Sequence, residues 1–218
     1  MNLQQIIELL RSFDHALFTK INSLWANPFF DMYFPNITDL HRNPIAIVLL
    51  PSIIGLWIFR QRGRALKGLL ALIIAVGASD LVSYRIIKAY VPRDRPAAAG
   101  LPVELRTENH SGNSFPSNHA ANVFAAATII TLLHPPFFLI AFFLALSVAY
   151  SRVYVGVHFP SDVLAGAVIG YLIAKFVWSF IGHKVDQMDY EDSGNKSRFY
   201  ITRARDEQRA NRRAKRRR

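Results

Sequence analysis

Three short polar clusters carry residue types that could together bind and cleave a phosphate. They cover Lys88 to Pro96, Phe115 to His119 and Ser151 to Asp162. Each cluster adjoins a long apolar run, a setting in which charge is costly unless it is paired or functional. Arginine can bind a tetrahedral anion through two parallel hydrogen bonds, and lysine adds a point charge. We therefore predict an anion site whose cations are Lys88, Arg95 and Arg152.

Two histidines in these clusters could perform the chemistry. His158 and Asp162 are four positions apart, so on a helix they would share one face. A carboxylate on one imidazole nitrogen fixes the tautomer and raises the nucleophilicity of the other nitrogen. His119 is then available to protonate a leaving oxygen. The pattern predicts a nucleophilic histidine, a carboxylate that supports it and a second histidine as general acid.

Two of the clusters also stand where a helix should begin. Ser117 and Asn118 precede an apolar run and could cap its first turn, and Pro160 suits the first turn of the next helix. Helix N-termini present free backbone amides, which bind phosphate. A lone histidine, His/Asp pair or cation at such a position is more often structural. The coincidence of all three clusters favours a catalytic site.

The elements that must position these clusters are long apolar runs. Five of them predict membrane-spanning helices, at about 44–60, 66–90, 119–134, 137–151 and 161–182. A short basic loop, from Arg60 to Lys67, separates the first two runs. We therefore predict an all-α fold, a multi-pass transmembrane helical bundle within one membrane domain, residues 1–183. The basic tail that follows, residues 184–218, is expected to be disordered.

The first residues, 1–26, predict an amphipathic helix. Leu3, Ile6 and Leu10 lie on one helical face, whereas Glu8 and Arg11 lie mostly off it. The segment is too polar to span a bilayer, and we expect it to lie in the membrane interface. A surface helix packed on protein would show the same pattern.

Charge and cysteine content narrow the choices further. The chain has 26 Lys and Arg against 15 Asp and Glu, a net charge of +11. The loop at 60–67 and the tail are both strongly basic, so both should be cytoplasmic and the three clusters should share the outer face. The tail could instead bind nucleic acid, but topology and anionic lipid already account for it, and we expect no nucleic-acid partner. The absence of cysteine excludes a disulfide framework, a thiolate metal site and a cysteine-nucleophile phosphatase.

Taken together, the clusters resemble the signature of the type-2 phosphatidic acid phosphatase superfamily. The matching pattern is Lys, six residues and Arg-Pro, then Pro-Ser-x-His, then Ser-Arg, five residues, His, three residues and Asp. It extends from Lys88 to Asp162, and the surrounding hydrophobic segments are also similar to those of that superfamily. Such a combined motif is highly specific.

The resemblance implies a role for each residue. His158 would take the phosphoryl group. Asp162 would orient the imidazole of His158, and His119 would be the general acid. A larger set would hold the phosphate oxygens: Lys88, Arg95, Arg152, Ser117, Asn118 and Ser151. Neither a cofactor nor a metal would be needed, because the cations stabilise the charge of the transition state.

One position departs from the pattern of the superfamily. Asn118 stands before His119, where members usually have glycine, a residue that lets a backbone amide approach the phosphate closely. Asparagine keeps the amide and adds a side-chain donor. We interpret the change as tuning of the site rather than loss of activity.

The resemblance also implies a substrate class. Similar proteins of this size are bacterial inner-membrane enzymes that act on undecaprenyl diphosphate, phosphatidylglycerophosphate, phosphatidic acid or lipid A. The short chain and its interfacial helix favour undecaprenyl diphosphate, and a lipid phosphotransferase with the same site is an alternative. Vanadium haloperoxidases have a similar anion pocket but are soluble, which the five apolar runs oppose. A non-catalytic membrane scaffold would be expected to lose a motif residue, and none is missing.

Other polar residues have two interpretations. Asp80, two helical turns before Lys88, could hold a cation or hydrogen-bond a neighbouring helix. The loop 97–113 contains Glu104, Arg106, Glu108 and His110. These four could touch a substrate headgroup, although solvated loop residues are the expectation we favour.

Overall fold

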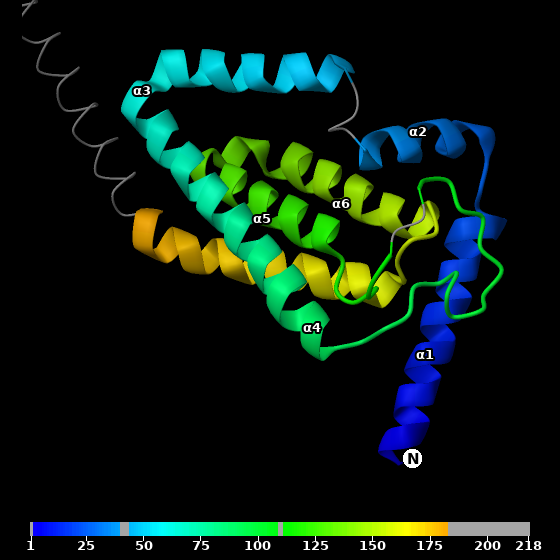
Figure 1. Ribbon diagram of the computed structural model, residues 1–218. Coiled ribbons are helices and arrows are strands. Elements are labelled where there is room, and N and C mark those ends of the chain that lie inside the picture. The colour runs from blue at the N-terminus through cyan, green and yellow to red at the C-terminus, as the bar shows by residue number, and fades with distance from the viewer. Residues whose placement is uncertain (1, 40–43, 109–110, 183–218) are drawn as a thin grey trace, which may run out of the picture.

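The computed structural model describes residues 2–39, 44–108 and 111–182, and the regular structure within them is helical throughout (Figure 1). The predicted all-α class is therefore confirmed. The N-terminal part contains α1 (Leu3–Thr19), the π-helical turn η1 (Lys20–Leu24) and α2 (Pro28–Thr38). The long helix α3 (Pro44–Asp80) continues through the π-helical segment η3 (Leu81–Ile87) into α4 (Lys88–Tyr90). After a long connection come α5 (Asn118–Leu133), the 3₁₀ turn η4 (Pro135–Phe137), α6 (Phe138–Tyr154) and a C-terminal helix, Pro160–Gly182.

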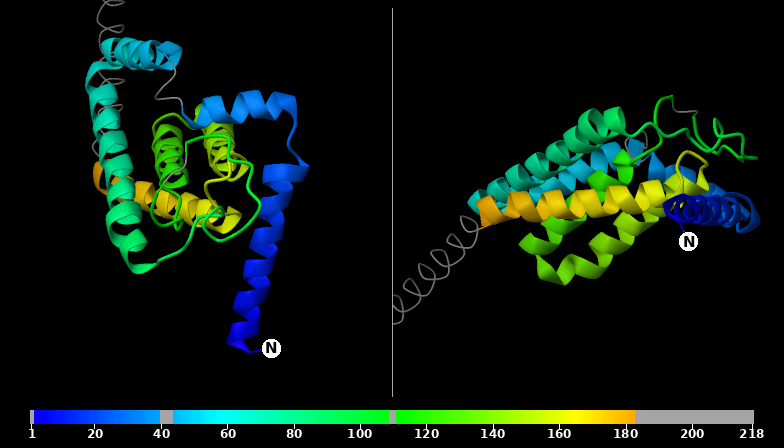
Figure 2. Two further views of the ribbon diagram at one scale, coloured as in Figure 1. Left: turned by 45° about the vertical axis from the view of Figure 1, so that its right-hand side comes forward. Right: turned by 90° about the horizontal axis from the view of Figure 1, so that it is seen from below.

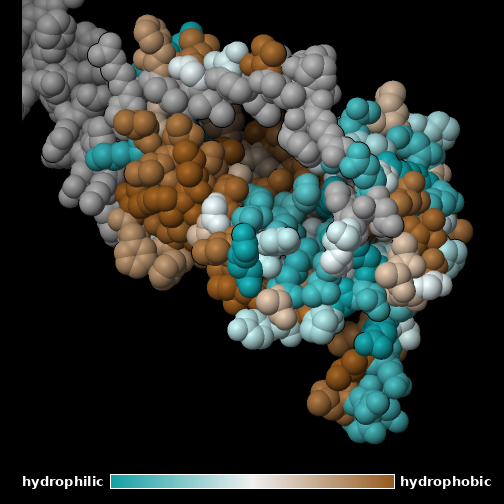
Figure 3. All heavy atoms as spheres, viewed as in Figure 1, coloured by the Kyte–Doolittle hydropathy of each residue, from teal (hydrophilic) through white to brown (hydrophobic). Residues whose placement is uncertain are grey.

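Several helices have the length and composition of membrane spans. Three segments qualify within the described residues, namely Ala65–Tyr90, Pro135–Tyr154 and Pro160–Gly182, and α5 is a shorter apolar helix. Outward-facing side chains such as Phe143 and Phe176 are apolar and about two-thirds exposed, as expected for contact with lipid. Figure 3 shows hydrophobic side chains gathered over the left part of the molecule and hydrophilic ones towards the right, where the connection 91–117 lies. The number of spans remains a prediction.

The predicted basic loop between the first two runs is wrong. Residues 60–67 continue α3 as helix, and Figure 1 shows the helix bending instead of ending. Arginine, glutamine, lysine and alanine are all good helix formers, so a polar interruption of an apolar run does not by itself stop a helix.

The chain brings four helix ends together. Figures 1 and 2 show the end of α4, the start of α5, the end of α6 and the start of the C-terminal helix at the same end of the bundle. These are the ends that carry the three polar clusters. The fold therefore gathers residues that are up to about seventy positions apart in sequence.

Close packing of the C-terminal helix against α5 depends on two glycines. A Cβ on Gly166 would lie 2.4 Å from the carbonyl oxygen of Ser117, and one on Gly170 would lie 2.0 Å from that of Ala121. Small residues four positions apart let two helix backbones approach where side chains would separate them. This contact fixes the start of α5 beside the start of the C-terminal helix.

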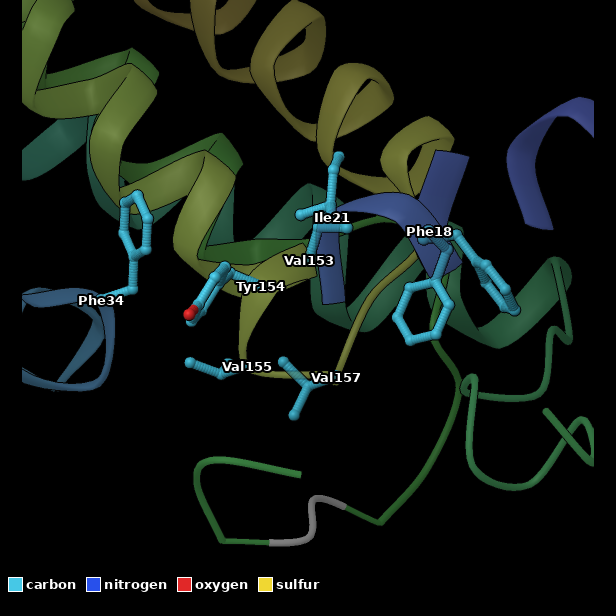
Figure 4. Close-up of a cluster of buried hydrophobic side chains, with 8 residues drawn as sticks. Phe18, Ile21, Phe34, Val153, Tyr154, Val155 and Val157 are labelled. Carbon is cyan, nitrogen blue, oxygen red and sulfur yellow. The ribbon is translucent and has the colours of Figure 1, made fainter. Parts of the chain in front are cut away.

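The N-terminal segment packs on the same end. Asn2 and Gln5 form a capping box at the start of α1, which points away from the bundle (Figure 2). Near its end Phe18 is buried in an apolar cluster that also contains Phe34 of α2 and Tyr154 of α6 (Figure 4). The predicted N-terminal helix is confirmed, whereas its place in the membrane interface remains a prediction.

Candidate active site

His158 and Asp162 form the centre of the site. The side chains are almost completely enclosed, and His158 Nδ1 lies 3.6 Å from Asp162 Oδ2. The prediction that the two residues share one helix face is wrong, because the C-terminal helix begins at Pro160 and His158 lies in the turn before it. Asp162 occupies the third helical position and its Oδ2 accepts the Phe159 amide at 2.8 Å, as the acidic residue of a capping box does.

The Asp162 carboxylate is held by further donors. The hydroxyl of Ser114 donates to Oδ2 at 2.5 Å and lies 3.4 Å from His158 Nδ1. Arg93 Nη1 donates to Oδ1 at 2.6 Å. A buried carboxylate needs such partners to remain charged. These donors hold the Asp162 carboxylate beside the imidazole of His158.

The other imidazole nitrogen faces Arg95. Arg95 Nη1 lies 3.5 Å from His158 Nε2 and donates to the Val157 carbonyl at 2.8 Å, while its Nε donates to the Gly112 carbonyl at 3.1 Å. Burial lowers the pKa of His158 from 6.5 to about 3, against the opposing attraction of the Asp162 carboxylate. The imidazole is therefore neutral at neutral pH, and Nε2 can offer a lone pair beside a bound phosphate.

The predicted cations converge on this pair. Arg152 is buried in the last turn of α6, and its Nη1 donates to Thr38 Oγ1 at 2.6 Å. Arg95 and Arg152 both interact electrostatically with His158, and Lys88 interacts with Arg95, Arg152 and Asp162. Like charges that interact are unfavourable unless anions offset them, and Asp162 and Asp80 each offset part of the charge at Lys88. That a tetrahedral phosphate binds among these cations remains a prediction.

The remaining predicted residues occupy the starts and ends of the same helices. Ser117 is the N-cap of α5, and its buried hydroxyl has no hydrogen-bond partner within the described residues. His119 is half-buried in the first turn of α5. Ser151 is buried, and its hydroxyl donates to the Val148 carbonyl of its own helix at 2.6 Å. Phosphate contacts by Ser117 and Ser151 remain predictions.

Asn118 and Asp80 form a polar contact between α5 and α3. The side-chain amides of Asn118 and Asn122 each donate to Asp80 Oδ1 at 3.2 Å. Asp80 also interacts electrostatically with Lys88. Both interpretations of Asp80 from the sequence therefore hold, because it bonds a neighbouring helix and stabilises a cation. The side chain of Asn118 is turned to this contact, and its backbone amide lies in the first turn of α5.

Three site residues were not found from the sequence: Asp14, Arg93 and Ser114. Arg93 bridges Asp162 and Asp14, with a distance of 2.5 Å from Nη2 to Asp14 Oδ2. Arg93 lay within a recognised cluster, so its spacing two positions before Arg95 was a usable signal. Asp14 carried none, since a carboxylate on an amphipathic helix is ordinarily solvated.

The expectation of a solvated loop fails at Arg106. Its guanidinium pairs with Asp31 at 2.6 Å and with Glu104, and it lies 4.6 Å from the ring centre of Tyr154. Asn22 binds the backbone of Glu104 through two hydrogen bonds of 2.9 Å. These contacts fix the loop on η1, α2 and α6. His110 lies outside the described residues.

An apolar cavity opens next to the site. It has a volume of about 500 Å³ and lies between α5, α6 and the C-terminal helix. Its lining includes Val153, which follows Arg152 in the sequence, and Pro160, two positions after His158, together with Tyr150 and Val163. A hydrocarbon chain would fit such a lining, whereas a polar soluble molecule would not.

Comparisons with known proteins agree with this arrangement. The PAP2 superfamily matches residues 67–186. The undecaprenyl-diphosphatase candidate YbjG of Escherichia coli is 32% identical over 146 residues, which cover 65% of this chain and 71% of that protein. The lipid A 4'-phosphatase of Bacteroides thetaiotaomicron is 28% identical over 188 residues, which cover 83% and 81% of the two chains. The crystal structure of a transmembrane PAP2-type phosphatidylglycerolphosphate phosphatase from Bacillus subtilis superposes with a TM-score of 0.60 at 29% identity, and the alignment covers 79% of this chain and 86% of that one.

Proposed function

Because the chain belongs to the PAP2 superfamily and is therefore a membrane phosphatase, we propose that it hydrolyses a lipid phosphate or diphosphate through a phosphohistidine on His158. The observation that carries this proposal is the enclosed imidazole of His158 between Asp162 and the cation Arg95. Asp162 occupies the Nδ1 side, so Nε2 is the nucleophilic atom. The cations hold the phosphate that it attacks.

The reaction proceeds in two transfers. His158 Nε2 forms a bond to phosphorus as the bond to the leaving oxygen breaks, and His119 gives that oxygen a proton. Water then attacks the phosphohistidine, with His119 taking its proton, and releases inorganic phosphate and free His158. Lys88, Arg95 and Arg152 stabilise the charge on the equatorial oxygens in both steps.

Among lipid substrates we favour undecaprenyl diphosphate. Relatives of this chain are named for an undecaprenyl diphosphate, a lipid A and a phosphatidylglycerophosphate substrate. Our preference for undecaprenyl diphosphate rests on the sequence, in which a chain with an N-terminal interfacial helix resembles the enzymes that act on this lipid. Lipid A or phosphatidylglycerophosphate hydrolysis, or transfer to an acceptor lipid, would use the same site.

Phosphate release from a panel of lipid phosphates and diphosphates tests the substrate. We expect the highest kcat/KM on undecaprenyl diphosphate. A higher value on phosphatidylglycerophosphate or on lipid A would contradict that preference, and a phosphorylated acceptor lipid in place of free phosphate would identify a phosphotransferase.

Phosphoenzyme trapping tests the two histidines. His158→Ala should abolish both turnover and the labelled phosphoenzyme. His119→Ala should lose more rate on a monophosphate than on a diphosphate, because an alkoxide leaving group needs a proton more than a phosphate does. General acid assistance is worth about 10²–10⁴-fold, so the difference is measurable. A phosphoenzyme that persists in His158→Ala and vanishes in His119→Ala would reverse the assignment.

We place the enzyme in the bacterial inner membrane with its site on the periplasmic face and its tail in the cytoplasm. The basic residues at 60–67 and 184–218 support this orientation. Reporters fused after Arg64 and Arg218 should give a cytoplasmic signal, and one inserted near Gly112 a periplasmic signal. A cytoplasmic signal at Gly112 would refute the orientation.

A further inference from the structure

We infer that Asp14, in the N-terminal helix α1, is a positioning residue for the pair His158 and Asp162. The inference rests on the proposed roles of those two residues. Asp14 lies far before residue 67, where the part of the chain matched to the superfamily begins. The motif that identifies the site therefore assigns it no role.

The carboxylate of Asp14 is buried although most of α1 is exposed. Asp14 has 6% exposure, whereas the preceding Phe13 has 65%. Its Oδ1 accepts the Ser161 amide at 2.9 Å, and its Oδ2 accepts the Ser161 hydroxyl at 2.5 Å. The Ser161 amide belongs to the first turn of the C-terminal helix, where a negative charge is stabilised. Asp14 thus binds the turn that also carries Asp162.

Arg93 connects Asp14 directly to the catalytic carboxylate. Its Nη2 binds Asp14 Oδ2 at 2.5 Å and its Nη1 binds Asp162 Oδ1 at 2.6 Å. The guanidinium also lies 4.3 Å from the ring centre of Phe159. Because the guanidinium is planar and rigid, fixing one nitrogen fixes the direction of the other. Asp14 therefore holds Arg93 against Asp162, and Asp162 holds the imidazole of His158.

Loss of Asp14 should lower the rate without weakening substrate binding. Asp14→Asn removes the charge that holds Arg93, and a displacement of about 1 Å at a catalytic group can cost about 10²-fold. We expect kcat to fall by about 10-fold to 100-fold with KM unchanged, since Asp14 acts on the catalytic pair and not on the bound lipid. Asp14→Glu keeps the charge and should recover part of the loss.

The matched control is Glu8→Gln. Glu8 is an exposed carboxylate on the same helix, so this variant removes the same charge at a position outside the site. It should keep the kcat of the wild type. Rates are measured on the full-length protein, on lipid phosphates and on p-nitrophenyl phosphate.

A double variant separates a positioning role from a structural one. If Asp14 acts through Arg93, then Asp14→Asn combined with Arg93→Lys should lose no more rate than the more damaging single change, because both break one bridge. If the two changes damaged the structure independently, their losses of rate would instead multiply. Arg93→Lys keeps the charge but cannot bridge two carboxylates as the guanidinium does, so it should lose rate by itself.

Several outcomes would overturn the inference. They are a wild-type kcat in folded Asp14→Asn, an equal loss in Glu8→Gln, or losses that multiply in the double variant. If Asp14→Asn does not fold, a fully active Arg93→Lys would refute the bridge by itself. A wild type that cleaves p-nitrophenyl phosphate but no lipid phosphate would refute the proposed substrate, and the variant ratios on the aryl phosphate would still decide the role of Asp14.

Discussion

Replacing Ser114 with alanine tests how the site holds its carboxylate. The Ser114 hydroxyl donates to Asp162 Oδ2 at 2.5 Å in a fully buried setting. A hydrogen bond to a charged group contributes about 1.5–3 kcal/mol, which corresponds to about 10-fold to 150-fold in rate if it is lost entirely in the transition state. Asp162 retains Arg93 and the Phe159 amide as donors. We therefore expect a loss near the lower limit, about tenfold in kcat.

The backbone around Ser114 should not move in this variant. The Ser114 amide donates to the Arg93 carbonyl at 2.7 Å, a bond that alanine keeps. Because Ser114 touches Asp162 rather than the lipid, KM should stay unchanged while the rate of phosphoenzyme formation falls with kcat.

Steady-state kinetics with rapid-quench trapping of the phosphoenzyme provides the assay. Ser111→Ala, an exposed serine in the same connection, is the control and should match the wild type. A Ser114→Ala enzyme with full kcat would refute the reasoning. A raised KM at constant kcat would show instead that Ser114 binds substrate.

Three further predictions concern packing, pH and metal. Gly170→Ala should lower the thermal midpoint, because its Cβ would lie 2.0 Å from the Ala121 carbonyl oxygen and overpacking of this kind costs about 1–3 kcal/mol. The control Gly77→Ala has open space at the Cβ and should not lower the thermal midpoint. Burial lowers the pKa of His158 from 6.5 to about 3, so the unfolded chain binds more protons than the folded chain between these pH values. Stability that is present above about pH 6.5 should therefore be lost as the pH falls through this window. Melting curves taken against pH should show a smaller loss for His158→Gln. Activity should survive EDTA and be inhibited by vanadate, since cations of the chain stabilise the phosphoryl group; loss in EDTA that a divalent ion restores would contradict this mechanism.

The sequence by itself determined the helical class, the polar clusters and the central residues of the site. Apolar runs long enough to cross a bilayer specify helices, because a backbone in lipid must satisfy its own hydrogen bonds. The proximity of His158 and Asp162 was also predicted from their spacing, although they meet across the start of the C-terminal helix and not on one helix face.

Only the tertiary structure decided which distant groups complete the site. Asp14 and Ser114 reach Asp162 or its arginine from a separate helix and from a long connection, and no local pattern relates those positions. Likewise, the bend of α3 in place of a loop, and the attachment of Arg106 to Asp31, depend on what each segment meets after folding. A solvated carboxylate and a buried, bridging one have the same sequence appearance, because the difference between them is the surroundings supplied by the rest of the chain.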